Sequence, residues 1–170
     1  MLLAFKILIA ASAFGISLFY GFKTSKKYSG RELYFSELVQ FCSGLAGEIG
    51  FRHAALADIF NKYAAIFKSL LSAQLKAAGE IVADGEIIDE AALRGKLPKG
   101  ALKPEEYDNV LLFFNTLGKS DADNQIDSAS SFKAIFQTSL EQARLDKKKY
   151  APLYWKLGLL GACAFVIVII

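Results

Sequence analysis

The residues whose types and spacing most suggest chemistry lie in one short stretch, LGKSDADNQI, at residues 117–126. It contains Gly-Lys-Ser, which ends a nucleotide-binding P-loop, and Asp-x-Asp, which begins many calcium loops. A P-loop also needs a glycine five residues before the Gly-Lys-Ser, after a strand, so that backbone N–H groups reach the phosphates, but Phe113 stands there inside a helical pattern. A calcium loop starting at Asp121 needs glycine at its sixth position and glutamate at its twelfth, where Ile126 and Phe132 stand. Neither site can be completed.

The same stretch fits a junction between two helices. Gly118 can adopt the left-handed conformation that closes a helix ending at Leu117. Ser120 can accept hydrogen bonds from the next helical turn, and Asp121 favours the positive end of that helix. The spacing Ser-x-x-Asp also resembles a capping box. We therefore predict a structural helix junction, whose motif residues are Leu117, Gly118, Ser120, Asp121 and Gln125.

The other reactive side chains give no sign of a catalytic, cofactor or metal site. His53 is the single histidine, and no partner for a metal site is apparent. Asp89 and Glu90 lie beside an Asp-Gly turn and favour a solvated face over an acid/base pair. Cys42 and Cys163 are expected to be reduced packing residues. The sequence therefore predicts a protein that is not an enzyme and binds no cofactor.

The elements that position these residues are predicted to be helices, because apolar residues recur mainly at helical intervals. No stretch alternates between apolar and polar residues, as a strand would, over a convincing length. One helix is predicted to run from Arg31. Its apolar stripe has residues four, three and four positions apart, namely Leu38, Cys42, Leu45 and Ile49. Gly44 and Gly47 interrupt this helix at a cost of about 1 kcal/mol each relative to alanine. We therefore expect both glycines to mark close packing against another helix.

Further helices follow along the chain. One is predicted over residues 54–78, with Gly79 as its stop, and a shorter one over residues 88–93. A loop over residues 95–103 precedes a helix that begins at Pro104, a residue favoured at the first helical position. The last helix is expected to bend at Pro152.

Both ends of the chain are apolar, which accounts for the mean hydropathy of +0.32. Residues 7–22 and 157–170 carry no charge, and about 20 apolar residues suffice for a transmembrane helix. The predicted fold is all-α, with transmembrane helices at residues 1–22 and 153–170 tethering a cytoplasmic helical bundle at residues 23–152. A cleaved signal peptide is the alternative for the first segment, but the fitting triplet Ala11-Ser12-Ala13 lies mid-run.

Basic residues flank these apolar ends on their inner sides. The six that mark the flanks most clearly are Lys23, Lys26, Lys27, Lys147, Lys148 and Lys149. The positive-inside rule then predicts a cytoplasmic middle domain with both termini outside, and the flanking charges should attract membrane lipids. Between Glu32 and Ala143 there are 16 acidic against 10 basic residues, a net of −6, which disfavours nucleic acid as a partner.

Architecture and motif together resemble the stage III sporulation protein AB family of endospore-forming bacteria. The resemblance is carried by Leu117-Gly118-Lys119-Ser120-Asp121 with Gln125, by the basic run at residues 147–149, and by Arg31-Glu32-Leu33. The segment Glu48-Ile49-Gly50-Phe51 supports it, although Ala55 stands where the family usually has proline.

The resemblance implies a cytoplasmic domain similar to those of type II secretion F and type IV pilus platform proteins. It implies a non-catalytic membrane adaptor in the complex between mother cell and forespore, located in the mother-cell membrane around the forespore. The implied partners are the stage III sporulation AA ATPase and other proteins of that complex, with no small-molecule substrate. Two other readings stay open: a small holin-like pore, although neither apolar end shows a polar stripe, and an extracytoplasmic domain with a tail anchor.

Overall fold

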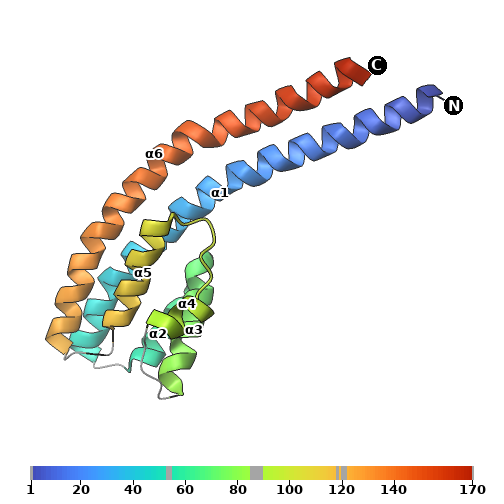
Figure 1. The fold of residues 1–170 in the computed structure, drawn as a ribbon. Helices are drawn as coiled ribbons and strands as arrows, with labels where there is room; N and C mark the ends of the chain where they lie inside the picture. The colour runs from blue at the N-terminus through green and yellow to red at the C-terminus, as the bar shows by residue number, and fades with distance from the viewer. Residues whose placement is uncertain (1, 53–54, 85–89, 118, 120–121, 170) are drawn as a thin grey trace. The chain divides into compact units, whose positions relative to one another are not determined.

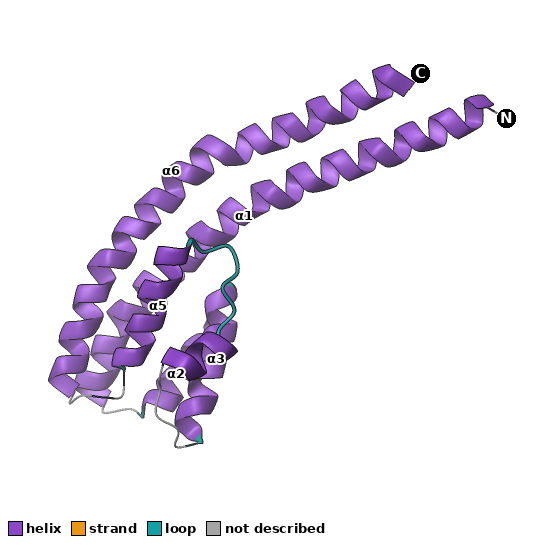
Figure 2. Cartoon of the chain, viewed as in Figure 1, coloured by secondary structure: helices purple, strands orange, loops and turns teal. Residues whose placement is uncertain are grey.

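The computed structural model describes the backbone of residues 2–52, 55–84, 90–117, 119 and 122–169. The side chains of residues 2–10, 13, 51, 52, 90–92, 122, 165, 166, 168 and 169 lie outside the description. This part of the chain contains helices and connecting loops but no strand (Figures 1 and 2), so the predicted all-α class is confirmed. The helices are α1 (Leu2–Arg52), α2 (Leu56–Ile66), α3 (Leu70–Ala83), α4 (Glu90–Lys96), α5 (Pro104–Thr116) and α6 (Ala122–Ile169).

The chain divides into two compact units, and the two long helices belong to both. Unit 1 comprises residues 1–29 and 143–170, and unit 2 comprises residues 30–142. Helix α1 passes from unit 1 into unit 2, and α6 passes from unit 2 back into unit 1. The shorter helices α2 to α5 lie wholly in unit 2.

The core of unit 2 forms around the predicted stripe of α1. All four stripe residues are buried, as are the neighbouring Phe35 and Phe41. Rings from three other helices meet this face: Phe41 lies 6.0 Å from Phe60 of α2 and 6.1 Å from Phe113 of α5, centroid to centroid. Phe113 in turn contacts Phe136 of α6 at 5.5 Å. An aromatic cluster thus joins four helices into one bundle.

The two glycines of α1 differ in their surroundings. A Cβ atom at Gly44 would lie 1.7 Å from the Tyr63 hydroxyl oxygen, so the close packing expected there is confirmed. Among the described residues, no atom lies within 4 Å of a Cβ atom built at Gly47, so the same expectation for Gly47 is wrong. Spacing alone does not say which of two glycines on a helix faces its neighbour.

The single helix predicted over residues 54–78 is wrong, because the chain breaks after Ile66 and restarts at Leu70. The break is held by Glu37 of α1, whose carboxylate accepts from the backbone N–H groups of Lys68 at 2.9 Å and Ser69 at 3.1 Å. The Ser69 hydroxyl also donates to Glu37, and its oxygen accepts from Leu71 N at 3.2 Å, which caps α3. A contact from a distant helix therefore overrides the local helical pattern.

Two other helix ends differ in detail from the prediction. Gly79 lies inside α3, which continues to Ala83, so it is not the helix stop. The short helix α4 is placed at Glu90–Lys96, where residues 88–93 were expected. Helix α5 does begin at Pro104, and Glu106 Oε2 accepts from the Lys103 backbone N–H at 2.9 Å.

Within the described residues no helix has a stretch that is both long enough and apolar enough to cross a membrane. The transmembrane helices predicted at residues 1–22 and 153–170 are therefore not supported. The described apolar stretch of the first begins only at Ala11, and it is shorter than the roughly 20 residues that a spanning helix needs. The side chains of residues 1–10 lie outside the description. Helix α6 runs without interruption past Pro152.

Candidate functional site

The predicted helix junction separates α5 from α6. Leu117 is fully buried and extended, and its N–H donates to the Phe114 carbonyl oxygen at 3.2 Å, so α5 ends at Thr116. Gly118, Ser120 and Asp121 lie outside the described residues, and their capping roles stay predictions. Gln125 lies in the second turn of α6 and is half-buried.

An open polar hollow lies beside this junction, with a volume of about 540 Å³. Seven of its eight lining side chains are polar or charged, and the eighth is Phe132: Asn115, Thr116, Lys119, Asn124, Asp127, Ser128 and Ser131. The Lys119 ammonium donates to the Asn115 side-chain oxygen, which ties the junction loop to the end of α5. Such a surface can exchange hydrogen bonds with a polar partner, whereas a nucleophile with its base is not apparent in it.

A buried ion pair was missed from the sequence. Arg31 of α1 is 5% exposed and Glu106 of α5 is 8% exposed. The Arg31 Nε donates to the two Glu106 carboxylate oxygens at 3.2 and 3.0 Å, and a terminal guanidinium nitrogen donates at 2.5 Å. A signal for this pair was present, because Arg31 lies seven residues before Leu38 and therefore on the stripe that faces the core.

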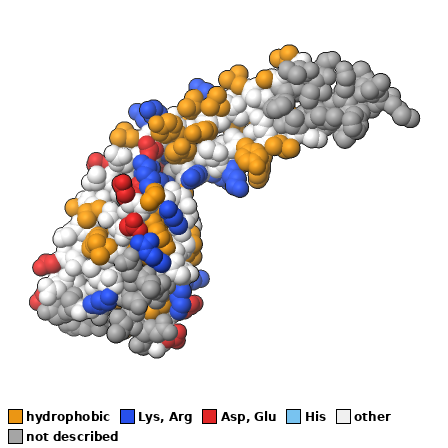
Figure 3. All heavy atoms as spheres, in the orientation of Figure 1, with side chains coloured by type: hydrophobic (Ala, Val, Ile, Leu, Met, Phe, Trp, Pro, Cys, Tyr) orange, Lys and Arg blue, Asp and Glu red, His pale blue; other side chains and the backbone are white. Residues whose placement is uncertain are grey.

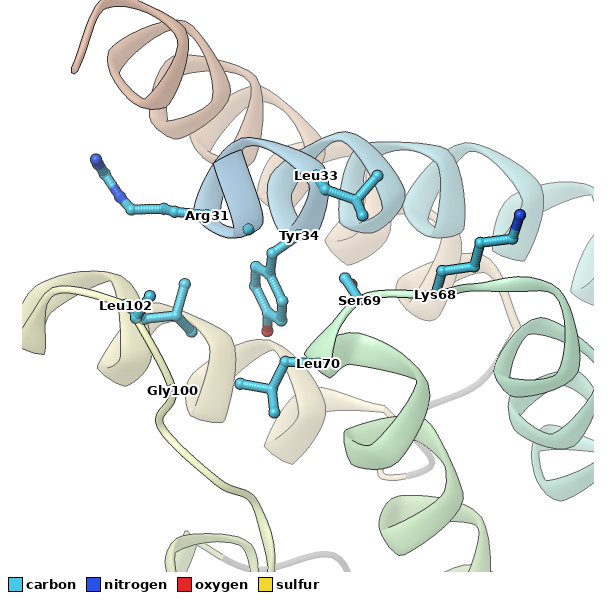
Figure 4. Close-up of a pocket in the computed structure, with 10 residues that line it drawn as sticks. Arg31, Leu33, Tyr34, Lys68, Ser69, Leu70, Gly100 and Leu102 are labelled. Carbon is cyan, nitrogen blue, oxygen red and sulfur yellow. The ribbon is translucent and has the colours of Figure 1, made fainter. Parts of the chain in front are cut away.

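A pocket of about 250 Å³ lies beside this ion pair within unit 2. Tyr34 projects into it from α1, between Leu70 of α3 and Leu102 of the loop before α5 (Figure 4). The Tyr34 hydroxyl donates to Gln74 Oε1 at 2.5 Å, and Gln74 Nε2 donates to the Pro98 carbonyl at 2.8 Å. Of the polar side chains that line the pocket, Tyr34 is bonded to Gln74, Ser69 to Glu37 and Arg31 to Glu106. The pocket can therefore accommodate an apolar group between Leu33, Leu70 and Leu102.

Burial favours the neutral form of two titratable side chains in the core, Cys42 and Tyr34. Burial raises the pKa of the Cys42 thiol to about 12, against a smaller opposing effect of Lys133. Burial also raises the pKa of Tyr34 well above its ordinary value, although its hydrogen bond with Gln74 acts in the other direction. The described residues include no group of three or more side chains suited to a metal ion, and His53 lies outside them.

Unit 1 is built around small residues where α1 and α6 lie side by side. A Cβ atom at Gly21 would lie 3.0 Å from the Gly158 Cα, so the backbones touch. The Ser17 hydroxyl donates to the Gly158 carbonyl oxygen at 2.9 Å, and a Cβ atom at Gly161 would lie 3.0 Å from that hydroxyl. Ala162 is fully buried in the same unit.

The predicted membrane-flanking lysines all lie in unit 1, in two segments that the fold brings together. Tyr28 stacks on Tyr150 at 5.6 Å and on Tyr154 at 5.8 Å, ring centroid to centroid. The structure therefore joins the segment of Lys23, Lys26 and Lys27 to that of Lys147, Lys148 and Lys149. Burial and contact with Tyr154 raise the pKa of the Tyr28 phenol.

Comparison with known proteins adds the remaining information. A search of curated proteins returns no match, and neither does a search of solved structures. Residues 6–170 match the protein-family model described as stage III sporulation protein AB, in agreement with the resemblance seen at the helix junction and its flanks. Since the match covers nearly the whole chain, this protein belongs to the stage III sporulation protein AB family and has a role in sporulation.

Proposed function

We propose that the chain is a membrane-attached, non-catalytic adaptor of the sporulation complex between mother cell and forespore. Unit 1 attaches it to the mother-cell membrane, and unit 2 presents a helical surface in the cytoplasm to a secretion-type ATPase. The stage III sporulation AA ATPase is the proposed partner, as the family resemblance implies. The adaptor couples the work of the ATPase to the membrane assembly.

Membrane attachment is supported by the packing of unit 1, which has small residues inside and large apolar side chains outside. Its helix contact buries small residues, with Gly21, Gly158 and Ala162 inside. Large apolar side chains are exposed instead, including Phe19 at 62%, Leu160 at 65% and Ile167 at 78%. Water would favour the opposite arrangement, whereas helices in lipid associate through small residues and expose apolar ones.

The polar hollow beside the helix junction is the proposed docking surface for the ATPase. It belongs to unit 2, whose net charge of −5 follows from 16 acidic against 11 basic residues. Its lining supplies donors and acceptors from α5, the junction loop and α6, so a partner that docks there contacts both helices at once. Movement of the partner can then reach α6 directly.

A liposome flotation experiment tests both parts of this proposal. The full chain should rise with liposomes through a density gradient and stay with them after extraction at high pH. The purified ATPase should float only when the chain is present. A chain that remains at the bottom of the gradient contradicts membrane attachment, and an ATPase that never co-floats contradicts the partnership.

Variants of the hollow localise the contact. The triple substitution Lys119→Ala, Asp127→Ala and Ser131→Ala should weaken binding of the ATPase at least about tenfold in co-flotation. Three hydrogen-bonding contacts of about 0.5–1.5 kcal/mol each together exceed the roughly 1.4 kcal/mol that corresponds to a factor of ten. A matched control carries Lys76→Ala and Glu80→Ala on the exposed side of α3 and should bind as the unmodified chain does. Equal loss in both variants would place the docking surface elsewhere.

A further inference from the structure

The inner end of unit 1 carries an unusual concentration of basic side chains. Unit 1 has nine basic residues against one acidic residue, Asp146, whereas unit 2 has 11 against 16. On the face seen in Figure 3, lysine and arginine side chains lie next to exposed hydrophobic ones on this unit. We name the described basic residues and the neighbouring rings the basic–aromatic cluster: Lys23, Lys26, Lys27, Arg144, Lys147, Lys148, Lys149, Lys156, Phe22, Tyr28, Tyr150, Tyr154 and Trp155.

Aromatic rings hold the cluster together and position its charges. The Phe22 ring of α1 meets the Trp155 ring of α6 edge to face at 6.4 Å, centroid to centroid. The Lys26 ammonium lies 4.5 Å from the centroid of Phe22, and the Lys149 ammonium lies 5.0 Å from that of Tyr150. The cluster is thus a folded surface rather than two separate basic runs.

The basic–aromatic cluster suits a ligand that has both negatively charged groups and an adjoining apolar part. Its lysines suit phosphate groups, and apolar side chains follow directly along α6, with Leu157 51% and Leu160 65% exposed. Tyrosine and tryptophan beside lysine are typical of the headgroup level of a bilayer. A phospholipid with an anionic headgroup offers both phosphate and hydrocarbon.

Nucleic acid is the competing polyanion, and the geometry of the rings disfavours it. Single strands bind to aromatic rings whose faces are free for stacking bases. Here Tyr28 stacks on both Tyr150 and Tyr154, at interplanar angles of 27° and 16°, so these three rings are already engaged with one another. The exposed leucines that follow would have no partner in a nucleic-acid complex.

We propose that the basic–aromatic cluster is a binding site for anionic phospholipid headgroups, which concentrates such lipids around unit 1. This inference rests on the proposed membrane attachment and adds the class of lipid that is selected. Each lysine near an anionic surface strengthens binding about fivefold. The three consecutive lysines at residues 147–149 should therefore contribute much of the preference.

Trp155 is the only tryptophan of the chain and lies in the cluster, so its fluorescence reports the neighbouring lipid. The full chain is reconstituted in bilayers that contain equal amounts of phosphatidylglycerol and phosphatidylcholine, with brominated chains on one lipid or the other. Brominated phosphatidylglycerol should quench Trp155 at least about twice as strongly as brominated phosphatidylcholine, and 0.5 M salt should weaken this preference. Inorganic phosphate at 10 mM should leave it unchanged, which separates a headgroup in a bilayer from free phosphate.

Two triple variants, each removing three positive charges, test whether the preference for phosphatidylglycerol arises from the cluster. Lys147→Gln, Lys148→Gln and Lys149→Gln together should abolish it. The control Lys68→Gln, Lys76→Gln and Lys99→Gln, in unit 2, should retain it. Loss in both variants, or retention in both, overturns the proposal.

The remaining outcomes separate this inference from membrane attachment itself. Equal quenching by the two brominated lipids overturns the inference but leaves attachment standing. Absence of quenching by either lipid overturns both. If single-stranded RNA binds the reconstituted chain and abolishes the lipid preference, and if the 147–149 variant loses that RNA binding, the cluster is a nucleic-acid site instead.

Discussion

At the scale of single residues, the ion pair between Arg31 and Glu106 is a buried charged contact between two helices of unit 2. It lies in the core beside Tyr34 and joins α1 to the first turn of α5. The same carboxylate accepts from the Lys103 backbone N–H, so one side chain neutralises a buried charge and caps a helix. Removing one partner of such a pair leaves the other charged and buried.

Glu106→Ala should therefore lower the free energy of unfolding by about 3–5 kcal/mol. Guanidinium unfolding of the full chain in detergent, followed by circular dichroism, measures this. The control is Asp108→Ala, which breaks the Arg94–Asp108 pair, whose side chains are 49% and 56% exposed. That change should cost less than about 1 kcal/mol, and equal losses would mean that the buried pair has no special role.

Sequence reasoning located the residues of the junction motif but not this pair. Motif spacing identifies residues that are close along the chain, whereas Arg31 and Glu106 are 75 positions apart. The position of Arg31 on the apolar face indicated that it is buried. Only the fold shows that Glu106 is its partner, because unit 2 has 16 acidic residues and spacing along the chain does not say which of them faces Arg31.

At the scale of elements, tertiary contacts decide where α2 ends and α3 begins. The apolar spacing continues from Leu56 to Leu71, so local preference alone favours one helix. Glu37 instead holds the two backbone N–H groups at the break, and the Ser72 hydroxyl donates to the Ala64 carbonyl at 2.6 Å. These bonds compensate the backbone groups that the break leaves without helical partners.

Glu37→Ala should lower the free energy of unfolding by about 1–3 kcal/mol, because the partly buried N–H groups of Lys68 and Ser69 lose their acceptor. Glu80→Ala, an exposed residue of α3, should change it by less than about 0.5 kcal/mol. Hydrogen exchange monitored by mass spectrometry should show faster exchange around residues 67–71 in the Glu37 variant alone. Unchanged exchange there would show that the break does not need Glu37.

The crossing of α1 and α2 gives a matched pair of glycine substitutions. Gly44→Ala should destabilise the chain by about 1–3 kcal/mol, because the new methyl group overlaps the Tyr63 ring. Gly47→Ala meets no atom within 4 Å and should stabilise it by up to about 1 kcal/mol through helix propensity. The difference in melting temperature between the two variants is the measurement, and equal melting temperatures would contradict the crossing.

The elements that the sequence predicted well are those with local signals. Pro104 marked the start of α5, and the apolar stripe marked the buried face of α1. The break at residues 67–69 had no such signal, since its cause is a carboxylate some 30 residues earlier. The transmembrane helices were predicted from the two uncharged end segments and the basic residues that flank them, and the described residues do not support them.

At the scale of the whole molecule, a buried thiol and a buried phenol make the stability of the fold depend on pH in the alkaline range. The folded Cys42 thiol keeps its proton up to a pKa of about 12, whereas its ordinary value is 9.0. Between these values the unfolded chain releases a proton that the folded chain retains, so rising pH favours unfolding. The raised pKa of Tyr34 acts in the same direction above its ordinary value of 10.0.

The melting temperature should therefore fall as pH rises from about 9 towards 12, with the stabilising contribution fully present below 9. Cys42→Ser and Cys42→Ala should both make this fall less steep, even though each lowers stability at pH 8 through poorer packing. Melting curves at half-unit steps of pH provide the test. An identical pH dependence in the unmodified chain and both variants would exclude Cys42 as a source of the effect.

The contact between Gly21 of α1 and Gly158 of α6 has a consequence for how the sequence of unit 1 can vary. A Cβ atom at either position would lie 3.0 Å from the Cα atom of the other. In many packed cores a larger side chain is accommodated when a neighbouring one becomes smaller. Here neither neighbour can become smaller, because both residues are already glycine. A larger residue at either position therefore requires the two helix backbones to move apart, and no substitution at the other position can compensate for it.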